Sequence, residues 1–167
     1  MKSGLRVGGW VRGVALVVGV LAPGVAQAQN TLGGHMGIAL PLATRSGGNT
    51  TTVGDPFSIG FPTGITIKMN ERVAFDVEFV PTIRKTPYAV SLTFHPGVIW
   101  ALENDFNAGL RMAFDVNQAS WGFTPLLNRK IGKVGTGGTL FGEIDVPLRF
   151  QNQNNSIGVG VHLGVAF

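Results

Sequence analysis

Acidic and basic residues recur at alternate positions within apolar stretches of this chain, in a spacing that brings them to one face. Asp76 and Glu78 are two residues apart, and so are Glu143 and Asp145. In a β-strand such pairs point to the same side. The residues predicted to form one polar cluster in this way are Asp76, Glu78, Arg111, Asp115, Glu143, Asp145 and Arg149. Carboxylates beside a cation could act as general acids or bases, or pair with it structurally, and we expect the structural role.

The sequence offers no nucleophile or metal-ligand pattern that would favour an enzyme. Cysteine is absent, which excludes a thiolate nucleophile and a disulfide scaffold. Ser91 and His95 share a strand face but lie roughly 13 Å apart on an extended chain. His35, His95 and His162 come from three separate segments with no metal-binding spacing. We therefore predict no catalytic residue, no metal ligand and no cofactor.

Alternation of apolar and small or polar residues continues through most of the chain after residue 33. Such period-two patterns, separated by Gly, Asn, Asp and Pro, predict β-strands. Eight segments of this kind are predicted, at residues 34–43, 57–69, 72–84, 88–102, 106–117, 121–130, 140–151 and 156–167. The polar stretch 44–55 is predicted to be the longest loop. Prolines recur within the segments, and we expect them at bulges or strand ends, because each removes a ladder donor.

The N-terminal 28 residues have the composition of an export signal. Lys2, Arg6 and Arg12 precede an apolar run at residues 14–22, and Ala26-Gln27-Ala28 fits a small-x-small cleavage site. Removing this segment takes three of the 13 Lys and Arg residues and none of the nine acidic ones, so the remaining chain is close to neutral. A nucleic-acid partner is therefore not expected. We predict a signal peptide at 1–28 and one domain at 29–167.

The last segment alternates large apolar residues with very small ones and ends on an aromatic residue. Val161, Leu163, Val165 and Phe167 share one face, whereas Gly160 and Gly164 lie on the other. A strand with a bulky outside and a small inside suits a narrow closed barrel in lipid. This segment resembles the closing strand of small bacterial outer-membrane β-barrel proteins, the porin-like or outer-membrane protein A-like superfamily. The resemblance implies that these four residues form the signal recognised by the barrel-insertion machinery.

Pattern and resemblance together predict an all-β fold. We expect an eight-stranded antiparallel up-and-down transmembrane β-barrel in the outer membrane of a Gram-negative cell, following a cleaved signal peptide. Its partners would be outer-membrane lipid, the insertion machinery and an unidentified external molecule. Because an eight-stranded barrel is just wide enough for its own side chains to fill, the polar cluster is predicted to plug the interior. The expected role is structural or surface-interacting, and an open pore is not expected.

Two alternatives remain open at this stage. The first is a soluble exported barrel that binds a small apolar ligand in the manner of lipocalins, with its large apolar residues facing inward. The second is a lipid-modifying hydrolase of the outer membrane, because some small barrels of this kind are lipid A deacylases. Their His-x-Ser motif is missing here, since His95 is followed by Pro96-Gly97 and His162 by Leu163-Gly164.

Overall fold

All eight alternating segments form β-structure in the computed structural model, which describes residues 32–167. The predicted signal peptide lies outside these residues. The strands are β1 (Leu32–Ser46), β2 (Asn49–Thr52), β3 (Ser58–Gly60), β4 (Thr63–Lys68), β5 (Val73–Arg84), β6 (Ala89–Ala101), β7 (Phe106–Asp115), β8 (Ser120–Val134), β9 (Gly138–Asp145), β10 (Leu148–Gln151) and β11 (Ser156–Ala166). The described part of the chain is therefore all-β and contains no helix. It consequently holds no helix of the length and hydropathy needed to cross a membrane.

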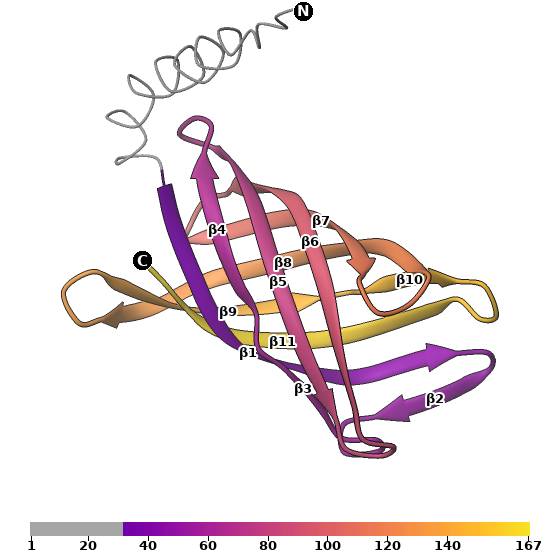
Figure 1. Cartoon of the computed structure of the whole chain (residues 1–167). Helices are drawn as coiled ribbons and strands as arrows, with labels where there is room; N and C mark the ends of the chain where they lie inside the picture. The colour runs from indigo at the N-terminus through magenta and orange to yellow at the C-terminus, as the bar shows by residue number, and fades with distance from the viewer. Residues whose placement is uncertain (1–31) are drawn as a thin grey trace, which may run out of the picture. The chain divides into compact units, whose positions relative to one another are not determined.

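The strands form one antiparallel sheet whose two ends meet, so that eight strands stand in a ring (Figure 1). Two of the eight positions are shared by broken strands: β3 and β4 both pair with β5, and β9 and β10 both pair with β8. The ring closes where β1 pairs with β11, from His35 opposite Ala166 to Ser46 opposite Ser156. The closing strand predicted from the sequence thus joins the first strand of the sheet.

Two predicted boundaries are wrong. The stretch 44–55 was expected to be a loop, but β1 continues to Ser46 and β2 pairs back onto it, with Ala43 opposite Thr52. Every residue of β2 is exposed, so this hairpin carries no hydrophobic periodicity that could have revealed it. The strand β8 also runs four residues past the predicted end at Lys130, with a register shift between Lys130 and Gly132. The last residues of β8 are exposed as well, so no hydrophobic periodicity marks where this strand ends.

The side-chain orientation of the ring is inverted relative to a soluble protein. Large apolar residues lie on the outside, where Ile144 is 56% and Leu163 is 55% exposed. The most buried side chains inside are polar: Asp76 is 1% and Glu78 is 2% exposed. The other outward apolar residues include Met36, Ile38, Phe61, Ile65, Phe79, Leu110, Met112 and Phe114. Phe141, by contrast, points inward and is 8% exposed.

Three of the prolines within the predicted segments lie at breaks or register shifts of the strands. Pro62 lies in the break between β3 and β4, Pro147 lies in the break between β9 and β10, and Pro41 lies at the register shift of β1. These three agree with the expectation of bulges and strand ends. The other interior prolines do not, because Pro81, Pro96 and Pro125 sit inside continuous strands.

Two of the interior prolines face a break in the adjacent strand. The Pro81 carbonyl accepts from Phe61 N, and the Pro125 carbonyl accepts from Val146 N, both at 2.9 Å. In an antiparallel strand the N–H and C=O of one residue point to the same neighbour. The donors that Pro81 and Pro125 lack would therefore have pointed at segments where the ladder is already interrupted.

Candidate functional site

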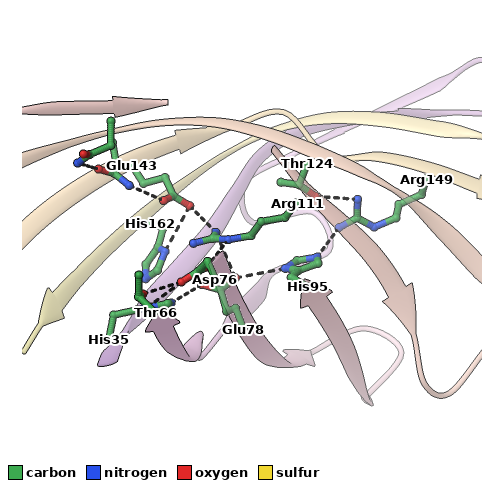
Figure 2. A network of polar contacts seen from close by, with 12 residues as sticks. His35, Thr66, Asp76, Glu78, His95, Arg111, Thr124, Glu143, Arg149 and His162 are labelled. Atoms are coloured by element: carbon green, nitrogen blue, oxygen red, sulfur yellow. Dashed lines mark hydrogen bonds and ion pairs between the residues drawn. The ribbon is translucent and has the colours of Figure 1, made fainter. Parts of the chain in front are cut away.

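A network of buried charged side chains crosses the inside of the ring, centred on Arg111 of β7. Figure 2 shows Arg111 between carboxylates from two other strands. Its Nε donates to Asp76 Oδ2 at 2.9 Å, and its Nη1 lies 3.1 Å from Glu143 Oε1 and 3.3 Å from Glu78 Oε1. All four residues are at most 4% exposed. Strand alternation brings Asp76 and Glu78 to the same face of β5, and the closure of the ring brings Glu143 of β9 opposite them.

His35 of β1 adds a second connection between the acids of β5. Its Nε2 lies 3.0 Å from Glu78 Oε2. Thr66 Oγ1 donates to Asp76 Oδ1 at 2.7 Å and lies 3.5 Å from His35 Nδ1. Because the single hydroxyl proton of Thr66 is directed to Asp76, the hydroxyl faces His35 as an acceptor. Both ring nitrogens of His35 therefore face acceptors, and the imidazole ties β1, β4 and β5 together.

His95 of β6 links Glu78 to a second arginine, and the chemistry of that arginine fixes its tautomer. Arg149 Nη2 lies 3.1 Å from His95 Nε2. A guanidinium only donates, so Nε2 is the acceptor nitrogen and the ring proton is on Nδ1. His95 Nδ1 then donates to Glu78 Oε1 at 3.2 Å. Arg149 Nη1 also donates to Thr124 Oγ1 at 3.1 Å (Figure 2). It donates to the Leu148 carbonyl at 3.0 Å as well.

His162 of β11 borders the network without a hydrogen bond to it. Its Nδ1 lies 3.6 Å from Glu143 Oε1, and its Nε2 is buried without a partner among the described residues. The ring packs edge-on against Phe141, with centroids 5.0 Å apart. Phe141 and Leu126 are 8% and 6% exposed and fill the interior toward the connection 135–137.

The structure brings together five of the seven residues predicted for the polar cluster and leaves two apart. Asp76, Glu78, Arg111, Glu143 and Arg149 belong to the network. Asp115 instead accepts from Thr93 Oγ1 at 2.7 Å and from Gln118 Nε2 at 3.2 Å, near the end of β7. Asp145 points inward, but no hydrogen bond or ion pair joins its carboxylate to another described residue. The cluster in the structure is therefore smaller than the one predicted from the strand phases.

The residues of the predicted C-terminal signal occupy outward positions at the seam of the ring. Val161 stands opposite Leu40 of β1, Leu163 opposite Ile38 and Val165 opposite Met36. Phe167 exchanges two backbone hydrogen bonds with Gly34, of 2.8 and 2.9 Å. Recognition of these residues by an insertion machinery stays a prediction.

The alternation places His35, His95 and His162 on inward phases, and all three join or border the network, although the predicted polar cluster did not include them. A second signal was the set of inward glycines, which make room for the large polar side chains. A Cβ on Gly64 would lie 2.6 Å from His35 Nε2, and one on Gly97 would lie 2.6 Å from Arg111 Cγ. An inward glycine on one strand thus marks where a long side chain from a neighbouring strand lies.

The network does not make a metal site. Among residues 32–167 no group of three or more His, Asp and Glu side chains is arranged to hold a metal ion. The physical reason is that Arg111 contacts three carboxylates, and their oxygens already accept from arginine, histidine and threonine donors. The arrangement joins side chains of β5, β7 and β9 by ion pairs across the inside of the ring.

Comparison of the chain with protein-family models, with curated proteins and with solved structures found no match.

Proposed function

We propose that this protein is an integral β-barrel of a bacterial outer membrane, with a closed interior and a structural or surface-interacting role. The observation that carries the proposal is the inverted side-chain pattern of the ring. Along the described strands the outward positions carry ionisable side chains only at Arg45 and Arg129, which lie near opposite ends of the wall. A charged residue at mid-depth on a lipid-facing barrel wall would cost roughly 2 to 4 kcal/mol. Lipid outside the ring explains this distribution, whereas water would not require it.

The dimensions and the aromatic residues of the wall support a membrane location. The strand β5 has 12 residues, which at about 3.3 Å each span roughly 40 Å along the strand, enough for a tilted crossing of an apolar band about 25 Å thick. Trp121 and Phe123 near the start of β8 and Phe150 near the end of β10 form an aromatic cluster, with ring centroids 4.8 to 6.4 Å apart. Trp100 and Phe167 lie near the opposite ends. Aromatic rings near both interfaces are typical of membrane barrels.

The soluble lipocalin-like alternative requires the opposite orientation. It would place the large apolar residues around an internal cavity and Asp76, Glu78, Arg111 and Glu143 in water. These four side chains are buried instead, and the outside of the ring is apolar. The orientation therefore favours the membrane proposal.

A structural or surface-interacting role follows from what fills the interior. The Arg111 network crosses it, and Phe141 and Leu126 fill the space on one side of the network. We therefore expect no continuous water-filled path. The parts free to contact other molecules are the connections between strands and the β1–β2 hairpin, with exposed Asn49, Thr50, Thr51 and Thr52. We assign no catalytic step to the protein.

The test is fractionation followed by heat modifiability. The full-length protein is expressed in a Gram-negative host, membranes are extracted with detergent, and gel mobility is compared with and without boiling. A closed membrane barrel should be found in the outer-membrane fraction, and the unboiled sample should migrate differently from the boiled one. A protein that is soluble without detergent and shows no mobility difference would contradict the proposal and favour the soluble barrel.

A further inference from the structure

The ring encloses a cavity of about 190 Å³ on one side of the charged network. Its lining includes Thr93, which lies on β6 between His95 and the connection 85–88, so the cavity is on the side of the network that faces that connection. Glu78, Arg111 and Glu143 form its floor. At about 30 Å³ per molecule the volume corresponds to roughly six waters. This is space for a small organic molecule.

Two charged groups in the cavity wall have no partner of opposite charge. Asp145 and Arg149 both line the cavity. Among residues 32–167 no cation lies within 4.0 Å of the Asp145 carboxylate, and no carboxylate lies within that distance of the Arg149 guanidinium. The two groups also form no ion pair with each other. Every charged side chain of the floor, by contrast, is paired with at least one opposite charge.

The guanidinium of Arg149 is held in place by neutral acceptors alone. It donates to the Leu148 and Phe123 carbonyls, to Thr124 Oγ1 and to His95 Nε2, at 3.0 to 3.3 Å. These bonds use Nη1 and one contact of Nη2, which leaves N–H groups free to donate. A positioned guanidinium with unused donors and no carboxylate partner is suited to bind a carboxylate from a ligand.

The carboxylate of Asp145 occupies a place that a glycine keeps free. A Cβ on Gly160 of β11 would lie 2.6 Å from Asp145 Oδ1 and 3.1 Å from Oδ2. The absence of a side chain at this position lets the carboxylate lie against the backbone of the neighbouring strand, at the border of the cavity. Its oxygens are free to accept from a ligand, and an ammonium group is the donor that also neutralises the charge.

We propose that this cavity binds a small zwitterion, whose ammonium group pairs with Asp145 and whose carboxylate pairs with Arg149. The opposite signs of the two unpaired charges favour a ligand that carries both charges over a simple amine or a simple acid. Val80 and Pro147, which also line the cavity, provide an apolar surface for a short aliphatic side chain. This binding activity goes beyond the proposed membrane role and does not depend on it, since the cavity lies inside the ring.

Isothermal titration of the folded, detergent-solubilised full-length protein tests the proposal with three probes of similar size: L-alanine, propylamine and propionate. At roughly millimolar concentrations, L-alanine should bind at least about tenfold more tightly than either single-charge probe. The variant Asp145→Asn should lose about tenfold in L-alanine affinity and leave propionate binding unchanged. The variant Arg149→Gln should show the converse, with propylamine binding retained.

The matched control is Asp115→Asn, which removes a carboxylate that points into the ring but does not line the cavity. It should bind L-alanine as the wild type does, and heat modifiability verifies that each variant is folded. Absence of L-alanine binding by the folded wild type would overturn the proposal. So would equal affinities for the three probes, or an Asp145→Asn variant that binds L-alanine as tightly as the wild type. The membrane proposal would stand in each of these cases, because its own test does not involve the cavity.

Discussion

Arg111 Nε donates a 2.9 Å hydrogen bond to Asp76 Oδ2, although β7 and β5 are not neighbours in the sheet. The strand β6 lies between them, so the bond crosses the inside of the ring. The same guanidinium contacts Glu143 of β9, two strands away on its other side. One side chain thus joins three strands, β5, β7 and β9, that share no backbone hydrogen bonds with one another.

Arg111→Ala should lower the unfolding midpoint of the protein strongly. The substitution leaves Asp76, Glu78 and Glu143 buried without their common cation, and breaking a buried ion pair in this way costs about 3 to 5 kcal/mol. The measurement is the temperature at which the unboiled gel form converts to the unfolded form. Arg84→Ala, which removes an exposed arginine at the end of β5, is the control and should leave the midpoint unchanged. An unchanged midpoint in Arg111→Ala would reject the structural role of the network.

His95→Phe should destabilise the protein more than His162→Phe. Both nitrogens of His95 are hydrogen-bonded. Its loss leaves the Arg149 Nη2 donor without this acceptor, at about 1 to 3 kcal/mol for an unsatisfied buried group, and removes one of the donors that contact Glu78 Oε1. His162 makes no hydrogen bond within the described residues, and a phenyl ring preserves its packing on Phe141. The same gel midpoint, measured for both variants, checks this order. If both variants were destabilised equally, the hydrogen bonds of His95 would add nothing to stability beyond the packing of its ring.

Gly64→Ala should destabilise the protein, whereas Gly132→Ala should not. The new methyl group at residue 64 would lie 2.6 Å from His35 Nε2 and 2.8 Å from the Val77 carbonyl, so His35 would have to move away from Glu78. Overpacking of this kind costs typically about 1 to 3 kcal/mol. No atom lies within 4 Å of the corresponding position at Gly132. Chemical denaturation of the two variants in detergent gives the comparison, and a wild-type midpoint for Gly64→Ala would mean that the interior is less tightly packed than its distances indicate.

The sequence predicts most strands and their inward and outward faces because large apolar outward residues alternate with small or polar inward ones. The eight segments and the outward phase of Val161 and Leu163 follow from the period-two pattern. The β1–β2 hairpin could not be predicted in this way, since all four residues of β2 are exposed and no burial selects their types.

The members of the charged network could be predicted only in part, because phase gives the direction of a side chain and not its height in the ring. Asp115 and Arg111 share the inward face of β7, yet only Arg111 stands level with Asp76 and Glu143. Height depends on the register between strands, and this register is set by pairs such as Gly97 with Arg111 and Asn128 with Glu143. Strand pairings of that kind are not visible in a single sequence.

The purified protein should give no stable channel current in a planar lipid bilayer. The Arg111 network fills the middle of the ring, and Phe141 and Leu126 fill the space next to it. An eight-stranded barrel leaves little further room once such side chains are in place. Single-channel recording of the wild type beside a wide porin, under the same conditions, makes the measurement. Discrete steps of steady conductance from the wild type would contradict the closed interior.

Val161→Arg should block assembly of the barrel, whereas Val161→Leu should not. Val161 points outward from the seam of the ring, where it stands between Leu40 of β1 and Ile144 of β9. In the proposed membrane location, an arginine there would face lipid near the middle of β11, at a cost of about 2 to 4 kcal/mol, and it would disrupt the face predicted to form the insertion signal. Fractionation and heat modifiability of the two variants measure the effect. If Val161→Arg reached the membrane and folded as well as Val161→Leu, the outside of the ring would tolerate charge, and lipid could no longer explain why its outward positions are apolar.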